Sequence, residues 1–125
     1  MLTIKVINNF KEFLSLKNDW NELLSKSDCD VPFLTHEWLT TWWECFGKRN
    51  KLLILLVKNS SNLIAAAPLM SSDINMYRLR LRRIGFIGNN LCYRLNFILT
   101  EQPKLALVKI FDFLIKNCHW DIIEL

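Results

Sequence analysis

The stretch LLILLVKNSSNLIAAAPLM, residues 52–70, decides the fold class of this chain. Its first seven residues form an apolar run that ends in lysine, which is typical of a strand buried on both faces of a sheet. The polar residues Asn59 to Asn62 predict a turn, and residues 63–70 predict a returning strand. Because proline has no N–H to donate, Pro68 must lie at a bulge or at a free edge. The stretch therefore predicts an antiparallel hairpin.

The residues before this hairpin predict one strand and two helices. Residues 2–7 alternate in polarity, as a short strand does. A helix is expected over residues 10–26, where apolar residues recur at steps of three and four. Thr35 can cap a second helix that ends at Gly47 and contains Trp38, Trp42 and Trp43. These rings either pack in the core or line a substrate groove, so Trp42 is a candidate substrate contact.

The residues after the hairpin predict two more strands, a helix and a last strand. The first strand covers residues 77–87 and the shorter second one residues 95–99. Pro103 suits the first turn of a helix, whose apolar side is expected to hold Leu107, Val108, Phe111, Leu114, Ile115 and Cys118. The closing WDIIEL, residues 120–125, predicts a strand with no polar tail after it. We therefore expect the chain to be truncated inside an element.

Together these elements predict one α/β (α+β) domain over residues 1–125. The expected order is β-α-α-β-β-β-(β)-α-β, with helices against a mixed, mainly antiparallel sheet. The 125 residues are 51% hydrophobic and 22% charged, which suits one domain with its own core. Only 3 residues are glycine, so the chain is poor in the residue on which phosphate-binding loops depend.

Composition and spacing argue against several classes of function. The four cysteines show no paired spacing, and His36 and His119 lie far apart in the sequence, so no metal site is expected. No apolar run approaches the ~20 residues that a membrane-spanning helix needs. The N-terminus lacks the apolar core of a signal peptide, and we expect a cytoplasmic protein.

Five segments of the chain resemble one family of acyltransferases. FLTHEWLTTWWECFG (33–47), the hairpin stretch, RRIGFIGNN (82–90), YRLNFIL (93–99) and WDIIEL are together similar to the N-terminal half of the CelD-like (cellulose-biosynthesis-type) acyltransferases of the GNAT superfamily. The resemblance implies a GNAT-like fold. It also implies transfer of an acyl group from acetyl-CoA or another acyl-CoA to an amine-type acceptor in polysaccharide or cell-envelope metabolism. In such proteins the first lobe is expected to shape the cleft for a small-molecule or saccharide acceptor. A C-terminal lobe, missing here, would carry the acetyltransferase domain.

The chain is a poor match to the loop that binds the CoA pyrophosphate in GNAT proteins. That loop has Gln or Arg, then Gly, then Gly or Ala, and it opens a helix whose amides bind the phosphates. Arg82 and Gly85 fit and are weak candidates, but Ile87 stands where Gly or Ala is required. Before the last helix, Glu101 would repel a pyrophosphate and Pro103 lacks an N–H. We therefore expect that this chain alone neither binds CoA nor catalyses.

The segment 92–99 carries no carboxylate. Tyr93 and Asn96 stand where the family often has aspartate, and asparagine cannot take a proton at neutral pH. The resemblance therefore assigns no catalytic residue, and both residues remain candidate acceptor contacts.

A basic run gives a further candidate site. Arg78, Arg80 and Arg82 alternate with leucines and would share one face of a strand. Such a face is solvated, protects an edge, or binds an anion such as a phosphate or a nucleotide-linked sugar. Few stacking aromatics flank the run, so nucleic acid is not favoured as a partner.

Two broad hypotheses therefore stay open. The chain is the N-terminal lobe of an acyltransferase, or it is a non-catalytic interaction or anion-binding module. A lobe without its partner would expose an apolar edge and self-associate through it.

Overall fold

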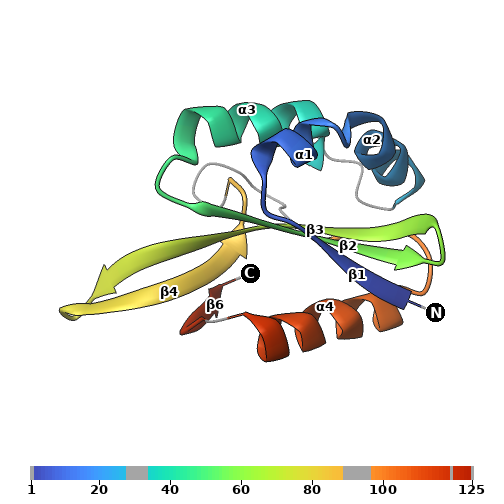
Figure 1. Ribbon diagram of the computed structural model, residues 1–125. Coiled ribbons are helices and arrows are strands. Elements are labelled where there is room, and N and C mark those ends of the chain that lie inside the picture. The colour runs from blue at the N-terminus through green and yellow to red at the C-terminus, as the bar shows by residue number, and fades with distance from the viewer. Residues whose placement is uncertain (1, 28–33, 89–96, 119, 125) are drawn as a thin grey trace.

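The structure is a computed structural model that describes residues 2–27, 34–88, 97–118 and 120–124. A six-stranded sheet with helices on both faces forms its body (Figure 1). The strands follow the order β1-β2-β3-β4-β6, and β5 pairs with β3. In chain order the elements are β1 (Leu2–Ile7), α1 (Phe10–Leu14), α2 (Lys17–Lys26), α3 (His36–Phe46), β2 (Lys51–Asn59), β3 (Asn62–Met76), β4 (Leu79–Phe86), β5 (Ile98–Leu99), α4 (Pro103–Asn117) and β6 (Ile122–Glu124).

Helices α1, α2 and α3 cover one face of the sheet, and α4 covers the other (Figure 1). Paired strands are antiparallel, except that β4 and β6 run parallel and are joined through α4. The predicted fold class is confirmed: helices flank a mixed, mainly antiparallel sheet.

The predicted hairpin is β2 and β3, and it is longer than expected. Asn59 pairs with Asn62 at the turn, and the pairing runs to Lys51 and Ser71 at the other end. Two strands pair with the same side of β3: β5 with its earlier residues and β4 with its later ones. Pro68 lies between these two pairings, and its carbonyl accepts a hydrogen bond of 2.9 Å from Ile87 N. In an antiparallel strand the N–H and C=O of one residue point the same way, so the missing N–H faces the gap between the two neighbours. β3 is an interior strand, so Pro68 does not lie at a free edge of the sheet; it lies just beyond the last β3–β4 pair, Leu69 with Phe86, where the ladder does not use its N–H.

The single helix expected over residues 10–26 is wrong, because the chain forms two helices there. Asn9 caps α1, with its Oδ1 accepting from Lys11 N at 2.8 Å. Ser15 then ends α1: its hydroxyl and its backbone N–H both donate to the Glu12 carbonyl. Such bonds between residues three apart tighten the last turn of a helix. The axis is broken there, and α2 starts at Lys17.

The expected start of a strand at Tyr77 is also wrong. β3 continues to Met76, which pairs with Leu79, so Tyr77 and Arg78 form a two-residue hairpin turn. Their φ angles are 51° and 65°. Left-handed backbone at both positions is typical of the type I′ two-residue turn, whose twist matches that of the flanking strands. Arg78 therefore lies in the turn and does not share a strand face with Arg80 and Arg82.

Each face of the sheet has its own core. On the first face, Trp20 and Leu39 are fully buried, and Trp42 is only 8% exposed. Trp20 Nε1 donates to the Leu34 carbonyl at 2.8 Å. His36 is buried as well, and its Nε2–H donates to the Phe13 carbonyl at 2.6 Å, which joins α3 to α1.

The apolar side expected for the last helix is only partly right. The residues of α4 that are buried against the sheet are Ala106, Ile110 and Leu114. Val108 and Ile115, expected to be buried, are 63% and 66% exposed. The sequence of α4 is apolar on two sides, so its periodicity alone does not tell which side meets the sheet.

Candidate functional site

Polar side chains gather on the face of the sheet that carries α4. Lys51 pairs with Ser71 across β2 and β3, and Asp73 pairs with Arg82 across β3 and β4. Side chains alternate along a strand, so Ser71 and Asp73 share a face with Leu69, which belongs to the α4-side core. The apolar core on this face is therefore continued by a polar group of residues.

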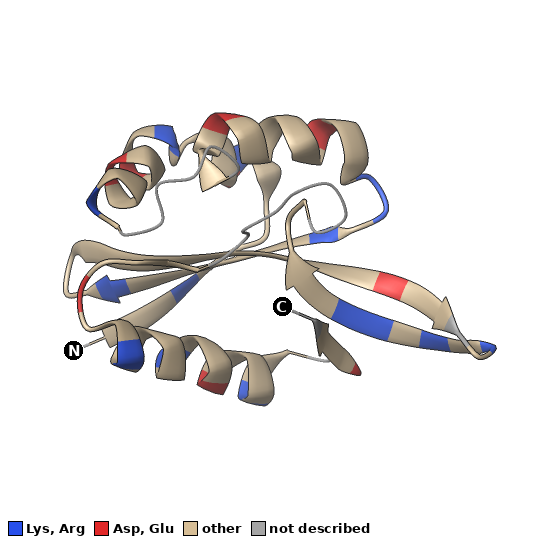
Figure 2. Cartoon of the chain, turned by 180° about the vertical axis from the view of Figure 1, so that it is seen from behind, with Lys and Arg blue, Asp and Glu red and all other residues tan. Residues whose placement is uncertain are grey.

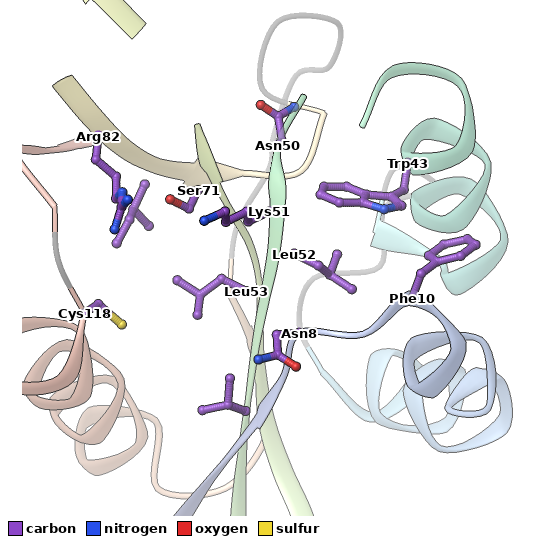
Figure 3. Close-up of a pocket in the computed structure, with 12 residues that line it drawn as sticks. Asn8, Phe10, Trp43, Asn50, Lys51, Leu52, Leu53, Ser71, Arg82 and Cys118 are labelled. Carbon is purple, nitrogen blue, oxygen red and sulfur yellow. The ribbon is translucent and has the colours of Figure 1, made fainter. Parts of the chain in front are cut away.

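Three of these residues, Lys51, Ser71 and Arg82, form one wall of a pocket of about 490 Å³. Figure 3 shows the side chains of Lys51, Ser71 and Arg82 pointing toward one another on one side of β2. Trp43 and Phe10 lie on the other side of β2 in the same view. The pocket thus joins a polar wall and an aromatic wall across one strand.

The pocket exists because β1 is shorter than β2. The last pair of β1 and β2 joins Ile7 to Ile54, so residues 51–53 extend beyond the end of β1. No strand among the described residues pairs with their backbone on that side, where Asn8 and Val6 line the space. A small molecule can therefore reach both the backbone edge of β2 and the side chains around it.

Gly47 positions the aromatic wall. Its φ of −85° is open to any residue, so conformational freedom does not explain the glycine. A Cβ at this position would lie 2.5 Å from Cδ2 and 2.8 Å from Cε3 of Trp43. The absence of a side chain lets the Trp43 ring lie back against the chain where α3 ends.

Positive charge prevails in the pocket. Of the described residues that line it, only Lys51 and Arg82 are charged. Among the residues that the structure describes, Lys51 makes no ion pair. Asp73 forms ion pairs with two arginines: its carboxylate lies 3.5 Å from Arg80 Nη2 and 3.9 Å from Arg82 Nε. One carboxylate cannot neutralise two guanidinium groups, so cationic charge remains in excess.

A second, more polar pocket of about 760 Å³ adjoins the first and shares Arg82 and Cys118 with it. Asp121 lies at its wall and holds β6 to β4. Its Oδ2 accepts from Arg82 N at 2.8 Å, and its own N–H donates to the Arg82 carbonyl at 2.8 Å. Figure 2 shows basic positions along β4 and an acidic position on β3 beside them. This mixed charge makes the second pocket less suited to an anion than the first.

Cys118 lines both pockets but is a poor nucleophile. Partial burial raises the pKa of its thiol above the ordinary value of 9.0, so the thiolate is scarce at neutral pH. A thiol needs a lowered pKa to act as a nucleophile. Cys118 therefore contributes apolar surface here.

The candidate site residues are found in different places. Arg82 lies in the first pocket, and Arg80 in the second. Trp42 packs in the core, while its neighbour Trp43 lines the first pocket. Tyr93 and Asn96 lie outside the described residues.

The sequence interpretation missed three pocket residues: Trp43 as the particular ring at the site, Lys51 and Ser71. Lys51 could have been found from its place directly before the apolar run, where a charged residue marks the start of a buried strand. Ser71 directly follows the expected end of the returning strand, and nothing in its neighbourhood marked it.

The weak match to a phosphate loop lies inside the sheet. Gly85 pairs with Met70 of β3 on one side and with Glu124 of β6 on the other. Its backbone is therefore committed to strand pairing and does not open a helix. At the start of α4, Gln102 is left-handed with φ 45°, and Pro103 follows it in the first turn. That helix start has one N–H fewer to offer an anion.

The described part of the chain lacks two further features. No three His, Cys, Asp or Glu side chains gather there in a way that could hold a metal ion. None of its helices combines the length and apolarity required to cross a bilayer.

Comparison with known proteins gives a likeness of fold. No family model and no curated protein sequence matches the chain. Among solved structures, a GNAT family acetyltransferase from Staphylococcus aureus matches over 99% of this chain and 86% of that chain. The TM-score is 0.52 and the sequence identity is 15%. The structure of this chain is therefore a GNAT-like α/β fold.

Proposed function

We propose that this chain is the acceptor-binding lobe of a GNAT-type N-acyltransferase. In this proposal an acyl group passes from acetyl-CoA or another acyl-CoA to an amine-type acceptor, as in CelD-like proteins of polysaccharide or cell-envelope metabolism. The observation that carries the proposal is an open pocket with an aromatic and a polar wall on a GNAT-like fold. Clefts of this size and mixed lining are typical of small-molecule sites. No residue is assigned a catalytic role.

The acyl-CoA is proposed to bind to a second lobe. Two observations support this division: the backbone of Gly85 is used in the sheet, and α4 begins with Pro103. Neither segment presents the row of free N–H groups that a pyrophosphate needs. The chain alone should therefore show no saturable binding of acetyl-CoA.

The outer side of α4 is the proposed contact with that second lobe. Leu105, Val108 and Ile115 are each more than half exposed along this helix. A helix with apolar residues on two sides is typically packed on both. In the absence of the second lobe, this side should bring two copies of the chain together.

The test starts with the protein from its own host. Its intact mass is compared with the 14.8 kDa of this sequence, and CoA release from acetyl-CoA is measured against a panel of amino sugars. We expect a larger mass and acceptor-dependent release of CoA. A mass of 14.8 kDa together with no CoA release would contradict the proposal. Saturable binding of acetyl-CoA to the 125-residue chain, lost in Arg82→Gln, would contradict the division into lobes.

A non-catalytic interaction module is the second candidate function. The exposed apolar side of α4 favours it, because such a surface serves association whether or not chemistry follows. The same measurement separates the two: a protein of 14.8 kDa that self-associates and releases no CoA is an interaction module.

A further inference from the structure

The first pocket has the chemistry of an anion site on one side of β2. Lys51, Ser71 and Arg82 supply an ammonium, a hydroxyl and a guanidinium group, and no carboxylate is among the described lining residues. An Arg fork and a Lys ammonium both bind carboxylates and phosphates, and a hydroxyl can donate to the same oxygens.

The three groups are held by the sheet rather than by a loop. Lys51 and Ser71 are direct partners across β2 and β3. Ser71 pairs with Ile84 of β4, and Arg82 lies two residues along β4 from Ile84, so Arg82 is a diagonal neighbour of Ser71 on the same face. Directly opposite side chains in a sheet have Cβ atoms about 5 Å apart, and diagonal ones about 7–8 Å apart. Lys51 and Arg82 lie on either side of Ser71 rather than next to each other, and their long side chains both point toward it in Figure 3. An acidic group placed at Ser71 can therefore contact all three residues.

Apolar side chains adjoin this polar group. Leu53, Val6 and Ile84 line the same pocket, and Trp43 lies across the free edge of β2. Lys51 is exposed and the Arg82 side chain is 42% exposed, so the apolar neighbours contact the body of a ligand rather than bury its head group. These neighbours disfavour a ligand that is charged along its whole length.

We propose that this pocket binds a small organic acid. Its carboxylate or phosphate lies between Lys51 and Arg82 with Ser71, and its apolar body lies along Leu53 and Val6. The inference rests on the proposed function only where it identifies the acceptor of the acyl group as an acidic molecule. Binding itself does not require acyl-CoA.

The experiment compares ligands that differ only in their head group. The 125-residue chain is titrated, without acyl-CoA, with 3-phenylpropanoate, 3-phenylpropanol and 3-phenylpropylamine, and phenethyl phosphate separates a phosphate from a carboxylate preference. Calorimetry or NMR shifts give the dissociation constants. We expect at least one of the two acids to bind about 10-fold more tightly than the alcohol, as expected for hydrogen bonds to charged groups, and the amine to bind most weakly.

Matched variants locate the head group. Lys51→Gln and Arg82→Gln should each weaken the favoured acid about 10-fold and leave the alcohol unchanged. Arg80→Gln is the control, because Arg80 is on the same strand and near the same Asp73 but lines the second pocket. It should change the affinity less than twofold. Far-UV circular dichroism checks that each variant is folded, and Arg82→Lys replaces Arg82→Gln if the latter unfolds.

Two results would overturn the inference. One is an amine that binds as tightly as both acids, and the other is a folded Lys51→Gln variant with unchanged affinity for the acid. Acid selectivity without acyl transfer by the native protein would overturn the proposed function alone. Acyl transfer without acid selectivity would overturn only the acidic acceptor.

Discussion

Replacement of Gly47 by alanine should destabilise the protein through the Trp43 ring. The added Cβ would lie 2.5 Å from Cδ2 of Trp43 and 2.6 Å from its carbonyl oxygen, both well inside van der Waals contact. Overpacking of this kind costs about 1–3 kcal/mol. The lower entropy of alanine in the unfolded chain offsets ~0.5–1 kcal/mol of that. The expected net loss is about 1–2 kcal/mol, or roughly 3–10 °C in the melting temperature.

The assay is urea denaturation of Gly47→Ala beside the parent chain, with Glu44→Ala as a control at an exposed position of the same helix. The control should change the free energy of unfolding by less than ~0.5 kcal/mol. In a Trp43→Leu background the cost of Gly47→Ala should fall, because the ring atoms in the clash are gone and only the carbonyl contact remains. A Gly47→Ala variant as stable as the parent would refute this account of the aromatic wall.

Three further predictions follow from other parts of the fold. The double variant Tyr77→Asn with Arg78→Gly should raise the free energy of unfolding by about 1 kcal/mol in urea denaturation, because it removes the strain of two left-handed residues. An unchanged free energy of unfolding would contradict this strain. Val108→Lys with Ile115→Lys should make the chain monomeric in sedimentation while its stability changes by less than ~0.5 kcal/mol, since both residues are exposed; persistent association would mean that another surface is used. Burial raises the pKa of Cys118, so its iodoacetamide labelling should stay slow until the pH exceeds 9.0. Because the folded pKa lies above 9.0, stability should be unchanged below pH 9.0 and should fall as the pH rises through the folded value; fast labelling at pH 7 would contradict the raised pKa.

The sequence predicts most of the sheet, because strand signals are local. The apolar run of β2, the polar turn after it and the helix start at Pro103 all depend on neighbouring residues. The turn at Tyr77 was missed because neither residue is typical of left-handed backbone. Only the pairing of β3 with β4 requires that conformation, and pairing is not a local property.

The site was predicted less well than the fold for a related reason. Arg82 was singled out as part of a basic run, but Lys51 and Ser71 meet it only through the register of three strands. The choice between Trp42 and Trp43 depends on which side of α3 faces the sheet. The spacing of apolar residues also could not predict which side of α4 is exposed, because both sides of that helix are apolar.

The short parallel strand β6 has a consequence for the order in which the fold assembles. β2, β3 and β4 are neighbours in sequence and can pair by closing small turns, whereas β6 reaches β4 only after the whole of α4 has been placed. Closing such a long loop is entropically costly and is rewarded by only three residue pairs and the two Asp121 bonds to Arg82. β6 should therefore dock last and open first, and its amides should exchange with solvent sooner than those of the central hairpin. Because Arg82 is fastened by the same bonds, each opening of β6 also loosens one wall of the pocket.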